Sequence, residues 1–170
     1  KIADETQLNE ASQLIQAACN IYIFGIGASG LTALDTESRF LRGGLQARAV
    51  TDPHFQAMHA SMASEGDLII AISLTGKTKD IYDALMIAKK NNAKIIVISN
   101  YILSHIAQLG DVLIQTAIEE HLLNGGSLTG KVSQIFAIDL LITYYEAHFG
   151  TDELAMREKI ARSIVNKQIN

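Results

Sequence analysis

The chain has 170 residues, enough to bury one sizeable core, and we expect a single domain. Its net charge is −4 and no run of Lys or Arg exceeds two residues, which disfavours nucleic-acid binding by this chain because such binding needs clustered cations. A single cysteine, Cys19, excludes an internal disulfide, and no apolar run approaches the ~18 residues of a membrane span, so we expect a cytoplasmic protein without membrane contact.

Hydrophobic spacing and turn signals predict strands that alternate with helices along the chain. We expect strands over residues 21–24, 46–50, 67–72, 94–99 and 112–115. We expect helices over residues 4–18, 30–42, 78–91, 132–149 and 152–168, a further helix opened by Asp52 as N-cap and Pro53, and a short one from Ser104 to Leu109. Residues 119–130 read as a polar, Gly-rich loop. This alternation predicts an α/β fold whose parallel sheet is covered on both faces and binds ligands beyond the carboxyl ends of its strands.

The predicted helix over residues 132–149 is apolar nearly all round. A helix without a polar face must be covered on both sides, so it belongs in the middle of the domain or at a subunit interface. Asp139 within it needs a partner inside the domain or across that interface. Hydrophobic residues make up 48% of the chain against 19% charged residues, which also favours apolar surface shared between subunits.

The loop after the first strand, residues 25–30, fits the Gly-x-Gly-x-x-Gly pattern of dinucleotide-binding proteins. A dinucleotide site also needs an acidic residue after the second strand, and Asp52 stands near that place but is better used as a cap before Pro53. Ser29 within the turn favours a phosphate group. The alternative that stays open is that the glycines only turn the chain tightly.

The loop after the third strand, residues 73–78, carries three hydroxyl groups and a glycine directly after a buried apolar run. Its end matches a Walker A loop, but Ala71 replaces the first glycine of that motif, which disfavours nucleotide triphosphate hydrolysis. Thr78 could merely cap the next helix, and Ser73 could merely bond to backbone groups. Lys77 could contact a phosphate or point to solvent. Two such loops on one sheet predict a site for a phosphorylated small molecule.

Other candidate residues are less specific. His54 lies in the first turn of a helix on the ligand side of the sheet, where it could contact a ligand or be a solvated surface residue. Glu120 in the polar loop could serve as a general base or accept a bond from a hydroxyl. His59, His105 and His148 lack partners at metal-ligand spacing, and we expect neither a metal nor a cofactor.

The two loops, their order and their separation resemble the SIS (sugar isomerase) domain, which carries Gly-x-Gly-x-Ser after strand one and Ser-x-Ser-Gly-x-Thr after strand three. The matching residues are Gly25, Gly27, Ser29, Ser73, Thr75, Gly76 and Thr78. Within that family the chain is most similar to the effector domain of RpiR/MurR-type bacterial transcription regulators. That similarity is carried by residues 40–44, 52–54, 88–93 and 129–134.

The resemblance implies a flavodoxin-like, three-layer α-β-α sandwich around a five-stranded parallel sheet, with residues 20–150 as the core of a single domain over 1–170. It implies phosphosugar binding by a homodimer or tetramer. The residues implied in the site are Gly27, Ser29, His54, Ser73, Leu74, Thr75, Gly76, Lys77, Thr78, Glu120 and Lys131. Thr75 stands where the family usually has Ser, and Lys131 stands where regulators often carry Arg, which removes a bidentate contact.

The function that the resemblance implies is a non-catalytic sensor of a sugar phosphate, which controls DNA binding by an N-terminal helix-turn-helix domain. We expect that domain to be absent from this sequence, because residues 1–20 hold one helix and the chain does not begin with Met. The alternative is an aldose–ketose isomerase acting on a sugar phosphate, for which Glu120 and His54 are the candidate bases.

Overall fold

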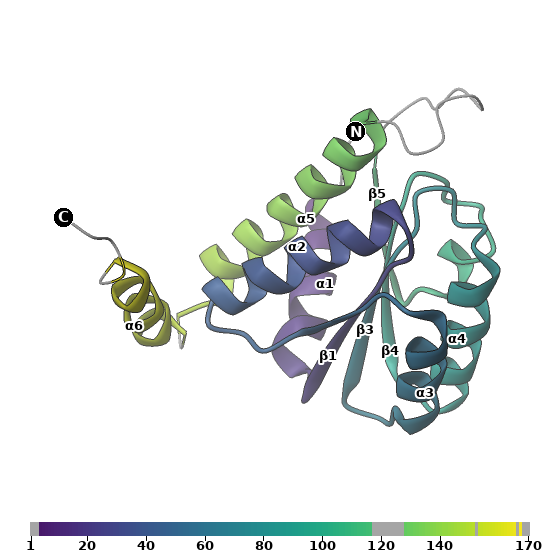
Figure 1. Cartoon of the computed structure of the whole chain (residues 1–170), viewed down its shortest axis with the longest axis horizontal. Helices are drawn as coiled ribbons and strands as arrows, with labels where there is room; N and C mark the ends of the chain where they lie inside the picture. The colour runs from purple at the N-terminus through teal and green to yellow at the C-terminus, as the bar shows by residue number, and fades with distance from the viewer. Residues whose placement is uncertain (1–3, 117–127, 152, 166, 168–170) are drawn as a thin grey trace.

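A computed structural model describes residues 4–116, 128–151, 153–165 and 167 of the chain (Figure 1). The elements in chain order are α1 (Glu5–Ala17), β1 (Asn20–Phe24), α2 (Ala28–Arg42), β2 (Arg48–Val50), α3 (Pro53–Met62), β3 (Asp67–Ile72), α4 (Lys79–Lys90), β4 (Lys94–Ser99), the 3-10 helix η1 (Ala107–Leu109), β5 (Val112–Gln115), α5 (Leu128–His148) and α6 (Leu154–Val165). The predicted α/β class and the alternation of strands and helices are confirmed.

The five strands form one parallel sheet in the order β2-β1-β3-β4-β5. This is the flavodoxin-like order, in which the chain reverses its direction of travel across the sheet between β1 and β3. Strand β1 pairs with β3 over its whole length, from Asn20 opposite Asp67 to Phe24 opposite Ala71. The loops that follow β1 and β3 therefore leave the sheet side by side at its switch point.

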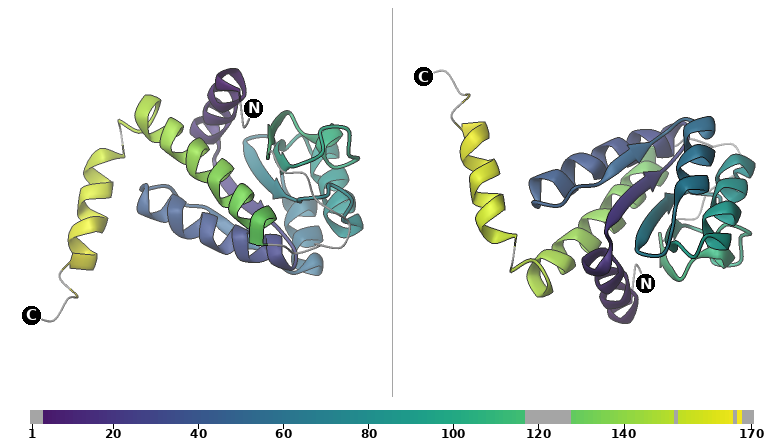
Figure 2. Two further views of the ribbon diagram at one scale, coloured as in Figure 1. Left: turned by 90° about the horizontal axis from the view of Figure 1, so that it is seen from above. Right: turned by 90° about the horizontal axis from the view of Figure 1, so that it is seen from below.

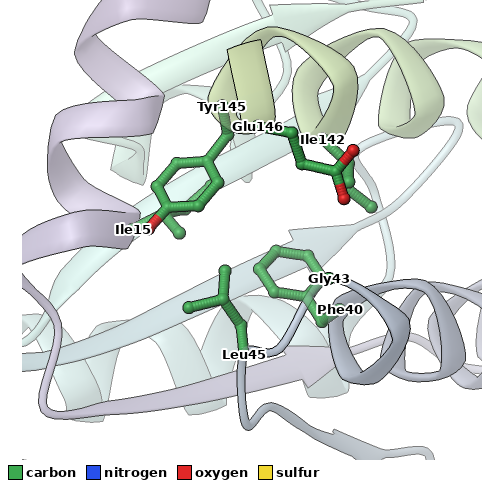
Figure 3. Close-up of a pocket in the computed structure, with 7 residues that line it drawn as sticks. All are labelled: Ile15, Phe40, Gly43, Leu45, Ile142, Tyr145 and Glu146. Carbon is green, nitrogen blue, oxygen red and sulfur yellow. The ribbon is translucent and has the colours of Figure 1, made fainter. Parts of the chain in front are cut away.

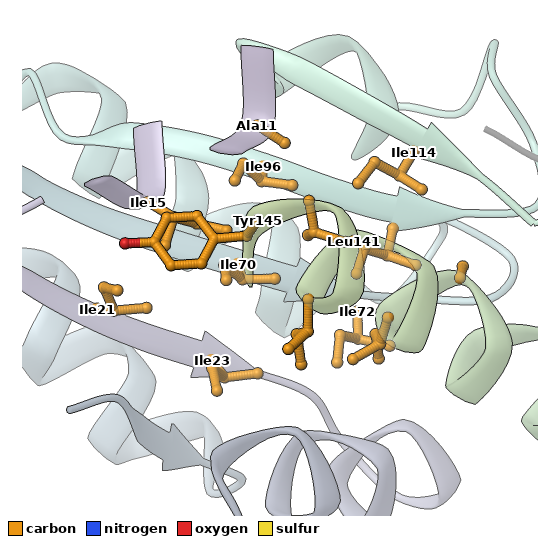
Figure 4. Close-up of a cluster of buried hydrophobic side chains, with 14 of the residues drawn as sticks. Ala11, Ile15, Ile21, Ile23, Ile70, Ile72, Ile96, Ile114, Leu141 and Tyr145 are labelled. Carbon is orange, nitrogen blue, oxygen red and sulfur yellow. The ribbon is translucent and has the colours of Figure 1, made fainter. Parts of the chain in front are cut away.

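Helices cover both faces of the sheet and make the predicted three-layer sandwich (Figures 1 and 2). On one face α1, α2 and α5 pack against the alternate strand residues that include Ile23, Ile70 and Ile96 (Figure 4). On the other face α3 and α4 pack against Ile69, Val97 and the remaining alternate residues. Every residue of β3 is buried, as expected for a central parallel strand that reads as a continuous apolar run.

The start of α3 is fixed by the cap that the sequence predicts. The Asp52 carboxylate accepts from the backbone N–H groups of His54 and Phe55, at 2.9 and 3.1 Å, and Pro53 takes the first helical position. This interaction holds Asp52 at the helix terminus, away from the ribose-binding role that a dinucleotide site would require.

Helix α5 begins earlier than predicted, and only its inner side is covered within this chain. It begins at Leu128, so residues 128–130, predicted to be loop, form its first turn, while residues 119–127 lie outside the described residues. Its inner side packs on the sheet through residues such as Ile138 and Leu141, but Val132 and Phe136 on its outer side are about half exposed. The helix therefore covers the sheet and is itself uncovered on its outer side within this chain.

Asp139 has the partner that its place in an apolar helix requires. Its carboxylate forms an ion pair with the guanidinium of Arg39 on α2, so the prediction of a partner inside the domain is confirmed. This pair joins α2 and α5 on the outer side of the sandwich.

The last helix, α6, leads away from the sandwich and contributes no buried residue (Figure 2). Its beginning is held by two contacts, from the Tyr145 hydroxyl to Glu153 and from Arg157 to Glu146, both at 3.1 Å. A small, mostly apolar cavity of about 10 Å³ lies at the same end of α2 and α5, close to the smallest space that holds one water molecule (Figure 3). It is lined by Ile15, Phe40, Gly43, Leu45, Ile142, Tyr145 and Glu146.

Candidate functional site

Two loops meet at the carboxyl edge of the sheet, where β1 and β3 end. Residue 25 directly follows β1, and residue 73 directly follows β3, its paired neighbour. In open parallel sheets ligands bind in the crevice at such a switch point. The fold therefore brings the two predicted loops to one place, as the sequence indicated.

The first loop turns sharply from β1 into α2. Gly27 adopts a positive φ of 60° as the N-cap residue, and its carbonyl accepts from the N–H groups of Gly30 and Leu31. A side chain on Gly25 would overlap the backbone carbonyl of Ser29, so only glycine fits there. No side chain caps this helix, and the N–H groups of Ala28 and Ser29, which open it, have no intrahelical partner.

Ser29, in the first turn of α2, is half-buried and held by a residue of α5. Its Oγ accepts a hydrogen bond from Nε2 of Gln134 at 3.1 Å, and Oε1 of Gln134 accepts from the Thr32 hydroxyl at 3.1 Å. Gln134 is 2% exposed. In the sequence, Gln134 is only part of the 129–134 segment that carries the family resemblance, and no role in the site was predicted for it.

A second buried amide fastens the first loop from the other side. Nε2 of Gln56 on α3 donates to the carbonyl oxygens of Gly25 at 3.2 Å and Val50 at 2.7 Å. These two carbonyls end β1 and β2, so Gln56 joins the carboxyl ends of neighbouring strands. The sequence offers only a weak signal for it, a polar residue on the buried side of a helix.

The second loop is held by backbone bonds to the end of β4 and to the segment that follows it. The N–H of Ser73 donates to Ile98 at 3.0 Å, the carbonyl of Leu74 accepts from Asn100 at 3.1 Å, and the carbonyl of Gly76 accepts from Ile106 at 3.3 Å. These bonds fix the loop from Ser73 to Gly76 without any contribution from a ligand.

The hydroxyl of Ser73 is the most unusual polar group in this loop. Ser73 is 3% exposed, and its Oγ has no hydrogen-bond partner among the described residues. Buried hydroxyls normally have a partner, and an exception calls for an explanation such as a ligand. The alternative reading, in which Ser73 bonds to nearby backbone groups, does not fit this arrangement.

Thr78 is the N-cap residue of α4, but its side chain makes no capping bond. The reading in which Thr78 only caps the helix therefore lacks its defining contact. Thr75 is exposed, and its Oγ1 accepts from the N–H of Lys77 at 3.3 Å. Gly76 has a positive φ of 65°, a backbone conformation that glycine adopts more readily than other residues.

Two lysines, Lys77 and Lys79, lie at the start of α4. Lys77 is exposed, and Lys79 pairs with Asp83, which raises the pKa of Lys79 through a hydrogen bond and charge attraction. An open depression of about 420 Å³ lies beside the loop, lined by Gly76, Lys77, Lys79, Tyr82 and His105. His105 is exposed, and its ring meets the edge of Tyr82.

The remaining predicted residues lie at the same edge or outside the described chain. His54 is exposed in the first turn of α3, which follows β2. Lys131 is half-exposed on α5, one turn before Gln134. Glu120 lies outside the described residues. The structure thus gathers every described candidate on the carboxyl side of the sheet.

Hydroxyl groups, backbone N–H groups and two helix N-termini together make an environment for an anion. Among the described residues, no group of three or more His, Cys, Asp or Glu side chains could hold a metal ion. The described helices also include none that is long and apolar enough to span a bilayer.

Comparison with known proteins finds bacterial HTH-type transcriptional regulators among the relatives of this chain. An uncharacterized HTH-type transcriptional regulator of Clostridium perfringens is 32% identical over 153 residues, which are 90% of this chain and 55% of that protein. The HTH-type transcriptional regulator RpiR of Escherichia coli is 32% identical over 138 residues, 81% of this chain and 47% of that protein. The chain thus spans about half the length of these curated relatives.

Among solved structures, the Vibrio vulnificus NanR protein complexed with ManNAc-6P is similar with a TM-score of 0.91 and 26% identity, covering 98% of this chain and 63% of that one. The family model described as SIS domain matches residues 13–144, a range that contains all five strands and both loops of the site. The chain therefore belongs to the SIS domain family.

Proposed function

We propose that this chain is the phosphosugar-binding sensor domain of a transcription regulator, whose DNA contacts are made by a helix-turn-helix domain outside this sequence. The observation that carries the proposal is the buried hydroxyl of Ser73, which lacks a partner among the described residues, at the edge of the sheet where α2 and α4 begin without side-chain caps. A phosphate group at this place would accept from that hydroxyl and from the helix N–H groups.

The relatives support the choice of ligand and of biological role. The regulators of Clostridium perfringens and Escherichia coli are HTH-type proteins, and the NanR structure, 26% identical, holds ManNAc-6P. A sugar phosphate joins a strong anion, suited to the two loops, with hydroxyls that nearby polar side chains can read. DNA regulation takes place in the cytoplasm, and we propose that location for the whole protein.

In the proposed complex, the second loop binds the phosphate. Ser73, Thr75 and Thr78 supply hydroxyl donors, and the backbone N–H groups from Leu74 through Gly76 and Lys77 to Thr78 supply the rest. A phosphate bound there would also lie near the charge of Lys77.

The first loop and the residues around it would contact the rest of the ligand. Gly27 and Ser29 approach the phosphate or the sugar from α2, and His54 and Glu120 read sugar hydroxyls. Lys131 supplies a further positive charge from α5. As a point charge it fixes an anion less strictly than an arginine fork would.

We also propose that the domain works as a homo-oligomer through the outer side of α2 and α5. Large apolar side chains are exposed on these two helices, namely Leu31, Leu34, Leu41, Val132 and Phe136. Arg39, Asp139 and other charges of both signs lie on the same side, which suits a self-complementary, two-fold contact. A ligand would regulate DNA binding by having different affinity for two arrangements of the subunits.

The proposal is tested by a thermal-shift screen against sugar phosphates and the same sugars without phosphate. Each stabilising compound is then incubated with the protein and examined by NMR for isomerised product. Stabilisation by phosphorylated sugars without turnover supports the sensor. Turnover would instead assign an isomerase, and stabilisation only by nucleotides would overturn the assignment of both loops.

A further inference from the structure

We propose that Gln134 is a positioning residue that sets the direction of the Ser29 hydroxyl, so that Ser29 donates its proton to the bound phosphate. This inference rests on the proposed function, because it assumes an anion beside Ser29. It concerns a residue of α5 that does not itself have to touch the ligand.

The geometry makes Gln134 a bridge between two helices. Its amide is buried, its Nε2 lies 3.1 Å from Ser29 Oγ, and its Oε1 lies 3.1 Å from Thr32 Oγ1. Both partners are on α2, one turn apart. The bridge therefore fixes the first turn of α2 against α5.

Counting protons shows what this bridge does to Ser29. A serine hydroxyl has one proton to donate and two lone pairs to accept. When Nε2 of Gln134 donates to Ser29 Oγ, the serine proton is not used by Gln134 and is free to be donated elsewhere. Thr32 then donates its own proton to Oε1 of Gln134.

The same hydrogen bonds can also run in the opposite direction, and the Ser29 proton is then donated to Gln134. If the amide of Gln134 is reversed, its oxygen accepts from Ser29 and its nitrogen donates to Thr32. Thr32 can then give its proton to the carbonyl of Ala28, which lies 3.3 Å from Thr32 Oγ1. Either direction of the hydrogen bonds gives partners to the Gln134 amide. Only the first direction, in which Gln134 donates to Ser29, leaves the Ser29 proton for an anion. Anion binding and this first direction therefore favour each other.

The test uses calorimetric titration with two probes, ManNAc-6P and inorganic phosphate. In Gln134→Glu the carboxylate can only accept, so both Ser29 and Thr32 donate to it and the Ser29 proton is lost to the anion. We expect affinity to fall at least roughly tenfold. In Gln134→Met the amide donor is removed but the Ser29 proton stays free, and we expect a smaller loss, about threefold. Gln46→Glu adds the same charge at an exposed position before β2 and should leave affinity unchanged.

A double-mutant cycle with Ser29→Ala separates positioning from charge repulsion and from misfolding. If Gln134 acts through Ser29, Gln134→Glu will change affinity less than about threefold in the Ser29→Ala background. An unchanged tenfold loss there would overturn the proposal, because repulsion by the new charge does not need Ser29. Equal affinity of Gln134→Glu and wild type would also overturn it. Wild-type protein that binds neither these probes nor any sugar phosphate of the screen would contradict the proposed function itself.

Discussion

Gly76 and Ser104 pack so closely that a methyl group on Gly76 would occupy the space of the Ser104 side chain. Ser104 is buried, and its Oγ accepts from the N–H of Ala107 at 3.2 Å, at the start of η1. The second loop of the site is therefore packed directly against the segment that follows β4.

Gly76→Ala should destabilise the protein by more than about 2 kcal/mol, since it combines a positive φ with this overlap. It should also weaken phosphosugar binding. Gly66→Ala is the matched control, because Gly66 also has a positive φ, of 96°, but would meet only the Cys19 side chain. Urea unfolding measures both, and an equal loss in the two variants would contradict the account of Gly76.

Ser73→Ala should leave the free energy of unfolding unchanged or raise it slightly, because the lost hydroxyl has no partner among the described residues. The same variant should weaken phosphosugar binding. Ser104→Ala should instead lose about 1 kcal/mol, since its hydroxyl accepts a hydrogen bond in the folded protein. A loss in Ser73→Ala as large as in Ser104→Ala would show that Ser73 serves the fold.

His59 should make the protein less stable in mild acid. Burial, and then the charge of Arg48, lower the pKa of His59 below its ordinary value of 6.5. The unfolded chain therefore binds a proton more readily, and the stabilisation present above pH 6.5 is lost as pH falls below it. Thermal unfolding of wild type and His59→Gln between pH 5 and pH 7.5 tests this. We expect a shallower pH dependence in the variant, and parallel curves would contradict it.

Phe136→Asp should break the proposed oligomer while leaving the domain folded, because Phe136 is 51% exposed on the outer side of α5. Met62→Asp is the matched control, an 81% exposed residue at the end of α3. Sedimentation at micromolar concentration should show a dimer or tetramer for wild type and Met62→Asp, and a lower mass for Phe136→Asp. A monomeric wild type would refute the oligomer.

Much of the fold can be predicted from the sequence because buried parallel strands are apolar runs with clear ends. The bounds of β3, β4 and β5 match their predictions, and Asp52 caps α3 as its place before Pro53 indicated. The position of the site follows from the same pattern, since loops after neighbouring parallel strands must meet at one edge.

The start of α5 and the hydrogen-bond partners of the buried glutamines could not be predicted, because they depend on tertiary contacts. Gly130 suggested a loop, yet it is buried in the first turn of α5, where packing overrides its low helix propensity. Gln56 and Gln134 are polar residues on buried helix sides, and only the folded chain shows which backbone carbonyl or hydroxyl each one meets. The apolar outer side of α5 indicated burial, and within one chain it remains uncovered.

The most direct test of the account is calorimetric titration of wild type and of the Ser73→Ala/Thr78→Val double variant with a panel of sugar phosphates that includes ManNAc-6P. We predict that at least one sugar phosphate binds wild type, that the same sugar without phosphate does not, and that the double variant binds at least roughly tenfold more weakly because two charge-assisted hydrogen bonds are lost. Equal affinity in the two proteins, or no binding of any sugar phosphate by wild type, would contradict the proposed phosphate site.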